Sequence, residues 1–426
     1  MKISGWGCYP IIDSSNVFLT SKTIWDTQFI TQGNSRSYGD ASLSENIYSS
    51  LQNNRLVDFD ETTGLLTCES GVLLSEIIDI FLPLGWFMLI TPGTKLITVG
   101  GAVSSDVHGK NHHMEGCFSS CVKSFELLLP GDQTVRCSLI ENRDLFHATC
   151  GGMGLTGVIT KVSFYLKKVE SQWIEQTTIK TLNLSETFST FEKYRNNTYS
   201  VAWIDCLAKG SDIGRSLVMV GEFAKDQDLD FKARSKVTVP FNLPGFILNS
   251  WSVKAFNAIY YTNNKFDLSE QKINVDNFFY PLDAVKHWNR IYGKNGFVQF
   301  QFILPKVNSF NGLSEILERI GQSGMGSFLA VLKLYGPQND NWLSFPLEGY
   351  SLALDFKMQK GLFSLIDELT DRVIELGGRI YLAKDALLTQ KQFDASYPKA
   401  NQFRQLRKEI GLEANFQSLL SRRLSL

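Results

Sequence analysis

Three glycine-rich stretches in the N-terminal part of this chain constrain its fold most strongly. They cover residues 33–40, 92–116 and 151–157 of 426. The third contains a GxGxxG spacing at Gly152, Gly154 and Gly157. In a dinucleotide-binding βαβ unit this spacing follows a strand and opens a helix, but here the alternating run TGVITKVSFYL follows it and predicts a strand. We therefore exclude that unit and expect glycine loops between strands.

Short strands and longer helices alternate along the chain. Apolar, branched and aromatic content predicts strands over residues 56–59, 65–68, 122–129, 156–166, 298–304, 328–334 and 350–356. Helical spacing predicts helices over residues 74–82, 143–150, 185–194, 283–292, 312–321 and 362–376. Glycine thins out near residue 171, so we expect a domain boundary near residue 170 and an α+β fold with helices on one face of a sheet. The aromatic residues 240–264 indicate a long loop with a short amphipathic piece.

Composition excludes two classes of protein. A formal net charge of -1 argues against a nucleic-acid binder, which needs a basic excess to neutralise phosphates. The most apolar stretch, residues 71–90, is interrupted by Glu76, Asp79 and Pro83, so it does not read as a membrane span. The N-terminus does not read as a signal peptide, and seven scattered cysteines predict reduced thiols. We expect a cytoplasmic protein, at most peripheral to the inner membrane.

The first two glycine-rich stretches have the composition of a phosphate cradle. Gly, Asn, Ser and Asp in residues 31–41 favour a turn whose backbone N–H groups converge on an anion, and Arg36 adds a positive charge. In the second stretch the paired Gly100 and Gly101 allow a ligand to approach closely. Hydroxyl donors for phosphates come from Thr94, Thr98, Ser104 and Ser105.

Three histidines lie in the motif HGKNHH of the second stretch. A metal site is one interpretation, but Gly109 indicates a loop and no carboxylate or thiolate partner accompanies the histidines. We therefore favour a polar-network role for His112 and His113 and expect no metal. His108 lies beside a glycine that permits close approach, where its imidazole would meet a bound cofactor or substrate.

Taken together, GNSRSYGD, TPGTKLITVGGAVSSDVHGKNHH and ATCGGMGLTGVIT resemble the FAD-binding half of the vanillyl-alcohol-oxidase-type flavoproteins, also called PCMH-type. The segments FFYPLD, WNR, QFQF, LSFP, GGRIYLAKD and RRLSL extend the resemblance, over nearly the full chain, to the branch of decaprenylphosphoryl-β-D-ribose oxidases. This resemblance implies a two-domain α+β fold. Residues 1–170 would bind FAD, residues 171–378 would form a substrate-binding antiparallel sheet flanked by helices, and residues 379–426 would return to the FAD-binding domain.

The resemblance also implies the cofactor and the residues that hold it. Some relatives attach FAD through a histidine in the first stretch, but this stretch has none, so a non-covalent FAD is expected. Ile159 would lie near the adenine half, and residues 105–108 near the isoalloxazine. The implied cofactor-binding residues are Gly33, Asn34, Ser35, Arg36, Ser37, Tyr38, Gly39, Asp40, Gly93, Thr94, Thr98, Val99, Gly100, Gly101, Ser105, Asp106, Val107, His108, Gly154, Gly157, Ile159 and Tyr381.

The resemblance points to a polar substrate face in the second half of the chain. Its implied catalytic residues are His108, Gln301, Lys333 and Lys384, and its implied substrate-binding residues are Tyr38, Gln299, Gln301, Lys333 and Lys384. Hydride removal from a carbinol carbon requires the hydroxyl proton to leave as well, so a base must lie within hydrogen-bond reach. Buried lysines would also stabilise negative charge on a reduced flavin. Without the resemblance, both lysines would read as exposed charges at strand ends.

The implied activity is FAD-dependent oxidation of the 2'-hydroxyl of a polyprenyl-phospho-β-D-ribose to the 2'-keto intermediate of epimerisation to the arabinose form, a cell-wall precursor. A separate NAD(P)H-dependent keto-reductase would be its partner. Residues 240–264 would cover the lipid tail or touch the membrane, and a loop packed on its own aromatics is the alternative. Two other functions stay open: oxidation of a soluble alditol or aldonolactone, and non-enzymatic binding of a flavin or nucleotide.

The chain departs from this branch at three positions and in one segment. Ala353 stands where mycobacterial members have a cysteine, a change that should not block catalysis. Ser351 replaces an asparagine and Phe279 replaces a tyrosine, and both changes alter the polar lining near the sugar. The segment between Pro10 and Gly33 is short for the helix and strand that the family has there, which would weaken flavin binding.

Overall fold

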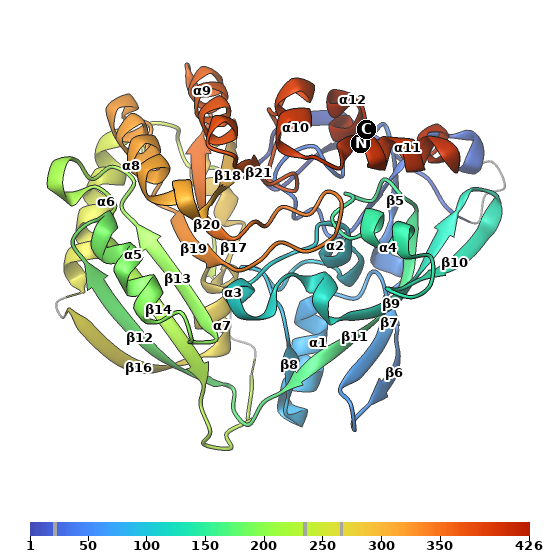
Figure 1. Cartoon of the computed structure of the whole chain (residues 1–426), viewed down its shortest axis with the longest axis horizontal. Coiled ribbons are helices and arrows are strands. Elements are labelled where there is room, and N and C mark those ends of the chain that lie inside the picture. Colours follow the sequence, from blue (N-terminus) through green and yellow to red (C-terminus); the bar gives the residue numbers. More distant parts are fainter. Residues whose placement is uncertain (20–23, 233–236, 265–266) are drawn as a thin grey trace.

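Two antiparallel sheets organise the chain (Figure 1). The computed structural model describes residues 1–19, 24–232, 237–264 and 267–426. The six-stranded sheet has the order β10-β9-β11-β7-β6, with β8 paired to β11. Its strands are β6 (Leu56–Asp60), β7 (Leu65–Glu69), β8 (Trp86–Met88), β9 (Val122–Leu129), β10 (Gln133–Cys137) and β11 (Val158–Lys168).

The larger sheet has eight strands in the order β16-β12-β14-β13-β19-β20-β18-β21. These are β12 (Trp173–Thr181), β13 (Tyr199–Ile204), β14 (Ser216–Phe223), β16 (Leu268–Asn274), β18 (Phe297–Pro305), β19 (Ala330–Tyr335), β20 (Gly349–Lys357) and β21 (Arg379–Ile380). Every pairing in it is antiparallel. The predicted α+β class, with a large antiparallel sheet flanked by helices, is confirmed.

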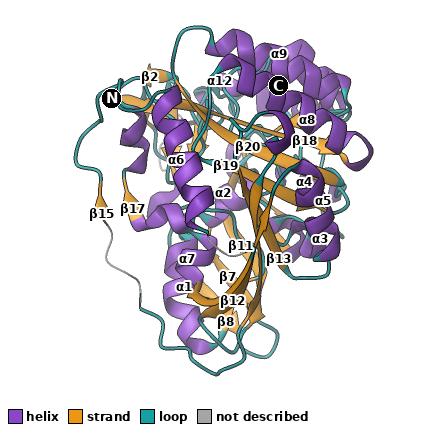
Figure 2. Cartoon of the chain, turned by 90° about the vertical axis from the view of Figure 1, so that its left-hand side faces the viewer, coloured by secondary structure: helices purple, strands orange, loops and turns teal. Residues whose placement is uncertain are grey.

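Strand alternation gives the large sheet two different faces. One face is covered by α5 (Leu184–Lys193), α8 (Lys306–Ser323) and α9 (Leu362–Glu375), and Ala202 and Val218 share a core with these helices. On the opposite face Trp203 and Leu217 pack with Tyr261 of α6 (Ser250–Asn263). Figure 2 shows α6 on one side of the sheet and α5, α8 and α9 on the other. The prediction of helices on one face is therefore incomplete, because α6 covers the second face.

Most predicted elements have the expected type, and one does not. The predicted helix over residues 283–292 is wrong: a 3-10 turn (Pro281–Ala284), the short strand β17 (Val285–Lys286) and a second 3-10 turn (Trp288–Tyr292) occupy it. His287 has a left-handed backbone with φ 56°, which interrupts any continuous helix. The helix in residues 240–264 has 14 residues and is longer than the predicted short piece; it begins after Asn249, whose side chain accepts from the backbone N–H groups of Trp251 and Ser252.

The N-terminal lobe contains a small parallel sheet. Its strands are β3 (Ser15–Asn16), β5 (Asn46–Ser49) and β4 (Ile30–Gln32), in that order. Between β3 and β4, where the resemblance implies a helix, the described residues form a 3-10 turn, Ile24–Asp26; residues 20–23 lie outside the described residues. The strand that the resemblance implies after this segment is present as β4. No helix in the described part of the chain is long and apolar enough to cross a membrane.

The C-terminal helices pack against the N-terminal third. They are α10 (Gln390–Ser396), α11 (Ala400–Glu409) and α12 (Leu419–Leu424). The Arg407 side chain is fully buried, and its Nε donates to the carbonyl oxygen of Leu155 at 3.0 Å. Arg423 of α12 bridges the carboxylates of Asp40 at 2.8 Å and Asp385 at 2.9 Å. This bridge joins the first glycine-rich stretch to the turn that follows β21.

We expect Arg423→Met to lower the thermal unfolding midpoint clearly. Asp40 and Asp385 are each about 5% exposed or less, and removing the arginine leaves both carboxylates buried without their cation. Loss of one partner of a buried pair costs about 3–5 kcal/mol. The matched control is Arg319→Gln, because Arg319 pairs with Glu368 on the surface, where screening by water leaves little to lose. Equal midpoints for the two variants would contradict the structural role of Arg423.

Candidate active site

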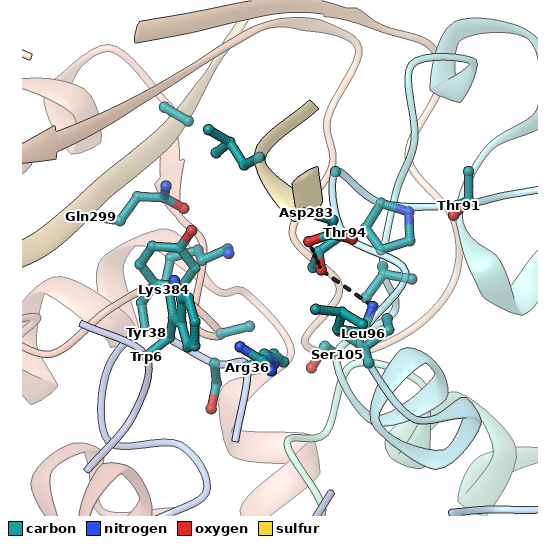
Figure 3. A pocket seen from close by; sticks show the side chains of 18 of the residues that line it. Trp6, Arg36, Tyr38, Thr91, Thr94, Leu96, Ser105, Asp283, Gln299 and Lys384 are labelled. Atoms are coloured by element: carbon teal, nitrogen blue, oxygen red, sulfur yellow. Dashed lines mark hydrogen bonds between the residues drawn. The ribbon is translucent and has the colours of Figure 1, made fainter. Parts of the chain in front are cut away.

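A cavity of about 1020 Å³ brings all three glycine-rich stretches against the large sheet. Ligand pockets in proteins usually measure about 300–1,000 Å³, so this cavity has room for a large ligand. Figure 3 shows Tyr38, Gln299 and Lys384 on one side of it and Thr94 with Asp283 on the other. Thr94 Oγ1 donates to Asp283 Oδ1 at 2.8 Å, which fixes the loop that carries Gly93.

Close approach of backbone and side chains explains two of the glycines in the cavity wall. A Cβ at Gly33 would lie 2.4 Å from Thr98 Oγ1, and a Cβ at Gly100 would lie 2.9 Å from the Cβ of Ser70. Thr98 caps the short helix α2 (Val99–Ser104) by accepting from the backbone N–H of Gly101. At Gly93 a Cβ would meet nothing, so this glycine leaves open space for a bound molecule.

Buried polar atoms without partners indicate that this cavity is built for a polar ligand. Among the described residues, Thr31 Oγ1, Arg36 Nε, Ser70 Oγ and His108 Nδ1 are buried and have no hydrogen-bond partner, and all four residues line the cavity. Buried polar groups are normally paired, so a bound molecule with acceptor groups fits here. The guanidinium of Arg36 also stacks 4.2 Å over the Trp6 ring, and burial lowers the pKa of Arg36.

Most of the predicted cofactor-binding residues line this cavity. They are Gly33, Asn34, Ser35, Arg36, Ser37, Tyr38, Gly93, Thr94, Thr98, Gly100, Gly101, Ser105, Val107, His108, Gly154, Gly157, Ile159 and Tyr381. Every predicted catalytic and substrate-binding residue lines it too: Tyr38, His108, Gln299, Gln301, Lys333 and Lys384. The structure thus brings together groups that lie far apart in the sequence, and their functions remain predictions.

Four predicted cofactor residues lie behind the cavity wall and have structural roles. A Cβ at Gly39 would lie 1.7 Å from the carbonyl oxygen of Asp385, and Asp40 pairs with Arg423. Val99 is fully buried in the core under the six-stranded sheet. Asp106 is fully buried, and its carboxylate accepts hydrogen bonds from Ser119 N, Asn339 Nδ2, Asn341 Nδ2 and Ser344 Oγ. These contacts satisfy its charge and anchor the loop that precedes His108.

The sheet supplies its polar residues at alternate positions of three neighbouring strands. Gln299 and Gln301 of β18 face the cavity with Lys333 of β19, and Gln301 pairs with Ala353 while Lys333 pairs with Ser351. The cavity wall therefore includes Ala353 and Ser351, and also Phe279, which are the three positions where the chain departs from the family pattern. Lys384 reaches the same site from the turn after β21, where its Nζ lies 3.6 Å from the centre of the Tyr38 ring.

His108 lies in an aromatic environment and contacts Gln301. The Gln301 amide donates to His108 Nε2 at 3.1 Å, so the neutral ring carries its proton on Nδ1. The Tyr381 and Tyr335 rings lie 4.9 Å and 5.1 Å from the imidazole. Burial, with a contribution from Lys333, lowers the pKa of His108 well below its ordinary value. At neutral pH this imidazole is an uncharged hydrogen-bond donor.

Several lysines share the cavity with few anionic neighbours. Burial lowers the pKa of Lys333 to about 8 and that of Lys110 to about 7. Lys110 Nζ donates to the carbonyl oxygen of Phe278. Burial also lowers the pKa of Lys384, which the charge on Asp355 partly offsets, and it raises the pKa of Asp355. Asp355 is 2% exposed and accepts from the Gln299 amide, so it acts on the cavity through Gln299 and Lys384.

The other two histidines of HGKNHH form hydrogen bonds with the backbone. His112 Nδ1 accepts from Gly336 N at 3.2 Å, and His113 Nε2 lies 2.9 Å from the carbonyl oxygen of Asn197. These contacts match the predicted polar-network role. His112 begins the short helix α3 (His112–Glu115), so the loop predicted from Gly109 ends at this residue. The described residues contain no group of three His, Cys, Asp or Glu side chains that could hold a metal ion.

Sequence reasoning missed several residues of the cavity. Lys110 was part of a recognised motif but received no role, and Trp6 carries no local signal because only tertiary packing brings it to Arg36. An apolar half of the cavity was also missed. It is lined by Val201, Trp203, Met219 and Ile273 of the sheet and by Phe256 and Tyr260 of α6, with Gln176 and Gln271 as polar residues of the same sheet in the cavity wall. Alternation in the strands would have revealed the first four once their common face was known.

Comparisons with known proteins agree with this site. The sequence signature of the FAD binding domain family matches residues 24–138. Decaprenylphosphoryl-β-D-ribose oxidase of Mycolicibacterium smegmatis is 35% identical over 93% of this chain and 89% of that protein. An uncharacterised protein from the mprA 5' region of Streptomyces coelicolor is 29% identical over 83% of this chain and 100% of its own length. A putative D-arabinono-1,4-lactone oxidase of Neurospora crassa is 26% identical over 32% of this chain and 24% of its own.

Fold, cavity and signature together define an FAD-binding flavoprotein whose cavity is lined on one side by a large antiparallel sheet. The chain belongs to the PCMH-type FAD-binding family of oxidoreductases, and decaprenylphosphoryl-β-D-ribose oxidase is one relative in that family to which it is similar over nearly its whole length.

We expect the reactivity of Lys384 toward a trace of acetic anhydride to respond in opposite directions to two substitutions. Asp355→Asn removes a negative charge that favours the ammonium form, so the pH of half-maximal reactivity should fall. Lys333→Met removes a like charge, so that pH should rise. Mass spectrometry of the modified peptide measures both, with exposed Lys360 as the internal reference. Shifts in the same direction would contradict the electrostatic coupling of these three groups.

Proposed function

We propose that this protein is an FAD-dependent oxidoreductase that oxidises the 2'-hydroxyl of a polyprenyl-phospho-β-D-ribose to the 2'-keto form. The observation that carries the proposal is the convergence of His108, Gln301, Lys333 and Lys384 in the cavity that the glycine-rich stretches line. The relative named for this substrate class is 35% identical over 93% of the chain, which supports the same assignment. In this proposal residues 1–170 form the cofactor domain, residues 171–378 the substrate domain, and residues 379–426 complete the former.

Residues of the three stretches would hold the cofactor. Residues 33–41 would hold its pyrophosphate, because Arg36 offers a buried unpaired donor there, and Gly100 would lie along the same cofactor beside the unpaired hydroxyl of Ser70. Gly157 and Ile159 would contact the adenine half, and His108 would approach the ring system. When bound, the flavin supplies the hydride acceptor.

The remaining chemistry is proton transfer and charge stabilisation by the chain's own side chains. Lys384 would accept the proton of the substrate hydroxyl, because burial lowers its pKa and leaves part of it neutral near pH 7. Lys333 would stay mainly protonated and stabilise negative charge that develops beside it, since its pKa is about 8. Gln299 and Gln301 would orient the sugar hydroxyls, with Gln299 held by Asp355 and Gln301 held by His108.

The apolar half of the cavity supports a lipid-linked substrate. Val201, Met219 and Ile273 have no polar group to offer a sugar, whereas a prenyl chain would bury their surface. The product of the oxidation is a 2'-ketone that still carries the lipid. Its reduction to the arabinose form would need a separate NAD(P)H-dependent reductase. The alternative substrate, a soluble alditol or aldonolactone, has a weaker basis, because the lactone oxidase match covers only 32% of this chain.

We expect the flavin to be released by acid. Residues 33–40 contain no histidine, and His108 contacts Gln301 through Nε2. Precipitation of the purified protein with trichloroacetic acid should therefore leave the yellow colour in the supernatant, as measured by absorbance and by the mass of the intact polypeptide. A yellow pellet with a polypeptide heavier by one FAD would contradict non-covalent binding.

We expect anaerobic addition of a polyprenyl-phospho-β-D-ribose to bleach the flavin absorbance of the purified protein. Lys384→Met should slow this bleaching by about 10²–10⁴-fold, the usual contribution of a general base. His108→Ala should reduce both flavin content and rate. The matched control is Lys360→Met, which removes an exposed lysine outside the cavity.

Two results would contradict the proposal. A colourless protein that FAD does not reconstitute would reject the cofactor. Bleaching by an alditol or aldonolactone, but not by the lipid-linked ribose, would instead assign the protein to the soluble branch of substrates.

A further inference from the structure

The described residues 237–264 expose an unusual amount of apolar surface. Trp251 is 82% exposed, Phe246 is 78% exposed and Phe241 is 63% exposed, and Ile259 is more than half exposed. Side chains of this size seldom stay exposed together on a protein surrounded by water, and contiguous apolar patches mark interaction sites. We call these residues the apolar face: Val237, Phe241, Phe246, Trp251 and Ile259.

Helix α6 shows that this exposure is not a consequence of poor packing. One side of the helix is well buried through Val253, Asn257 and Tyr261, and the Tyr261 hydroxyl donates to the carbonyl oxygen of Thr181. Its outer side presents Trp251, Ala255, Ala258, Ile259 and Thr262. The outer side of a surface helix normally carries charged residues. Here Lys254 is the single charged residue among residues 237–264, and no acidic residue occurs among them.

Two cations of the protein body hold the segment with this face outward. Arg290 Nη1 donates to the carbonyl oxygens of Val239 and Pro240, each at 2.9 Å. Lys357 Nζ donates to the carbonyl oxygens of Leu248 and Gly245. The backbone before α6 is therefore tied to the protein at both ends of the run that carries Phe241 and Phe246. The alternative interpretation, a loop packed on its own aromatics, describes Phe256 and Tyr260, whose rings stack at 5.8 Å, but not the exposed rings of Phe241 and Phe246.

The apolar face continues into the wall of the cavity. Phe256 and Tyr260 of α6 line the cavity, and Phe256 packs 5.6 Å from the Phe328 ring at its other side. The short strand β15 (Val237–Thr238) pairs with β17, which places exposed Lys286, at the cavity wall, opposite Thr238. Apolar side chains therefore lead from the protein surface to the apolar half of the cavity, and the exposed cations Lys254 and Lys286 lie beside Trp251 and Thr238 on this path.

We propose that the apolar face is a membrane-docking surface, whose large side chains enter the interface of a lipid bilayer and hold the cavity entrance against it. Trp and Phe side chains beside lysines are the composition of interfacial amphipathic segments. The absence of acidic residues from residues 237–264 removes the repulsion that an anionic lipid surface would exert. Delivery of a lipid-linked substrate through this entrance rests on the proposed function, whereas the bilayer contact itself does not.

Co-sedimentation of the full chain with phosphatidylcholine–phosphatidylglycerol vesicles tests this inference. The wild type should sediment with the vesicles. Phe246→Ser combined with Trp251→Ser should weaken binding on the order of a hundredfold, because each large apolar side chain contributes roughly tenfold when buried. The matched control is Ile140→Ser combined with Val307→Ser, which removes two side chains that are 97% and 87% exposed on other parts of the surface. The control should bind vesicles as the wild type does.

Three outcomes would overturn the inference. The wild type could stay in the supernatant, or both double variants could lose binding equally. In lipid-free gel filtration the wild type could also elute as a dimer that Phe246→Ser with Trp251→Ser dissociates, in which case a second copy of the chain covers the face. Vesicle binding requires no turnover, so a protein that binds vesicles but leaves the lipid-linked ribose unoxidised would contradict only the proposed function.

Discussion

The alternation of side chains across the eight-stranded sheet is the constraint on which the site depends. In β18 and β19 one set of residues packs under α8 and α9, and the other set, including Gln301 and Lys333, faces the cavity. A shift of register by one residue would place these polar groups in the core and apolar ones in the cavity. Burial of Phe300 and Phe302 on the helix-covered face therefore fixes the position of Gln301 between them. Packing energy on one face thus determines chemistry on the other.

Burial gives the cavity its electrostatic character. Lys110, Lys333 and Lys384 all line it, and the nearest buried carboxylate that acts on Lys384, Asp355, lies behind Gln299. The chain stabilises this collection of cations only in part, because each lysine loses hydration on burial. The lowered pKa values of Lys333 and Lys110 result from this loss of hydration, which destabilises the charged ammonium form. A bound molecule that carries phosphates or develops negative charge would recover some of it.

Much of the fold could be predicted from sequence because its signals are local. The spacing of apolar residues over a short stretch of sequence is enough to predict the strand over residues 122–129. The same holds for the helices near residues 74–82 and 362–376. The prediction of a helix over residues 283–292 failed because tertiary contacts of these residues outweigh their helical spacing of apolar side chains. Asp283 accepts hydrogen bonds from Thr94 and from the backbone of Lys95. These bonds hold the chain around Asp283 against the cavity wall, where it does not form a continuous helix. The glycine stretches indicated a ligand, but only tertiary structure shows that Asp106 supports the wall and that Trp6 forms part of it.

The bridge from Arg423 to Asp40 also bears on how the protein is made. The two residues are separated by 383 positions, so the ribosome completes the first glycine-rich stretch long before its partner exists. Contacts of such long range form late, because the chain must first lose the entropy of closing the loop between them. Before Arg423 is synthesised, the loop of residues 33–40 lacks the cation that pairs with Asp40, so burial of this carboxylate would be costly. Completion of the cavity wall is therefore expected to follow synthesis of α12, and a product truncated before Arg423 would lack the cation that joins Asp40 to Asp385.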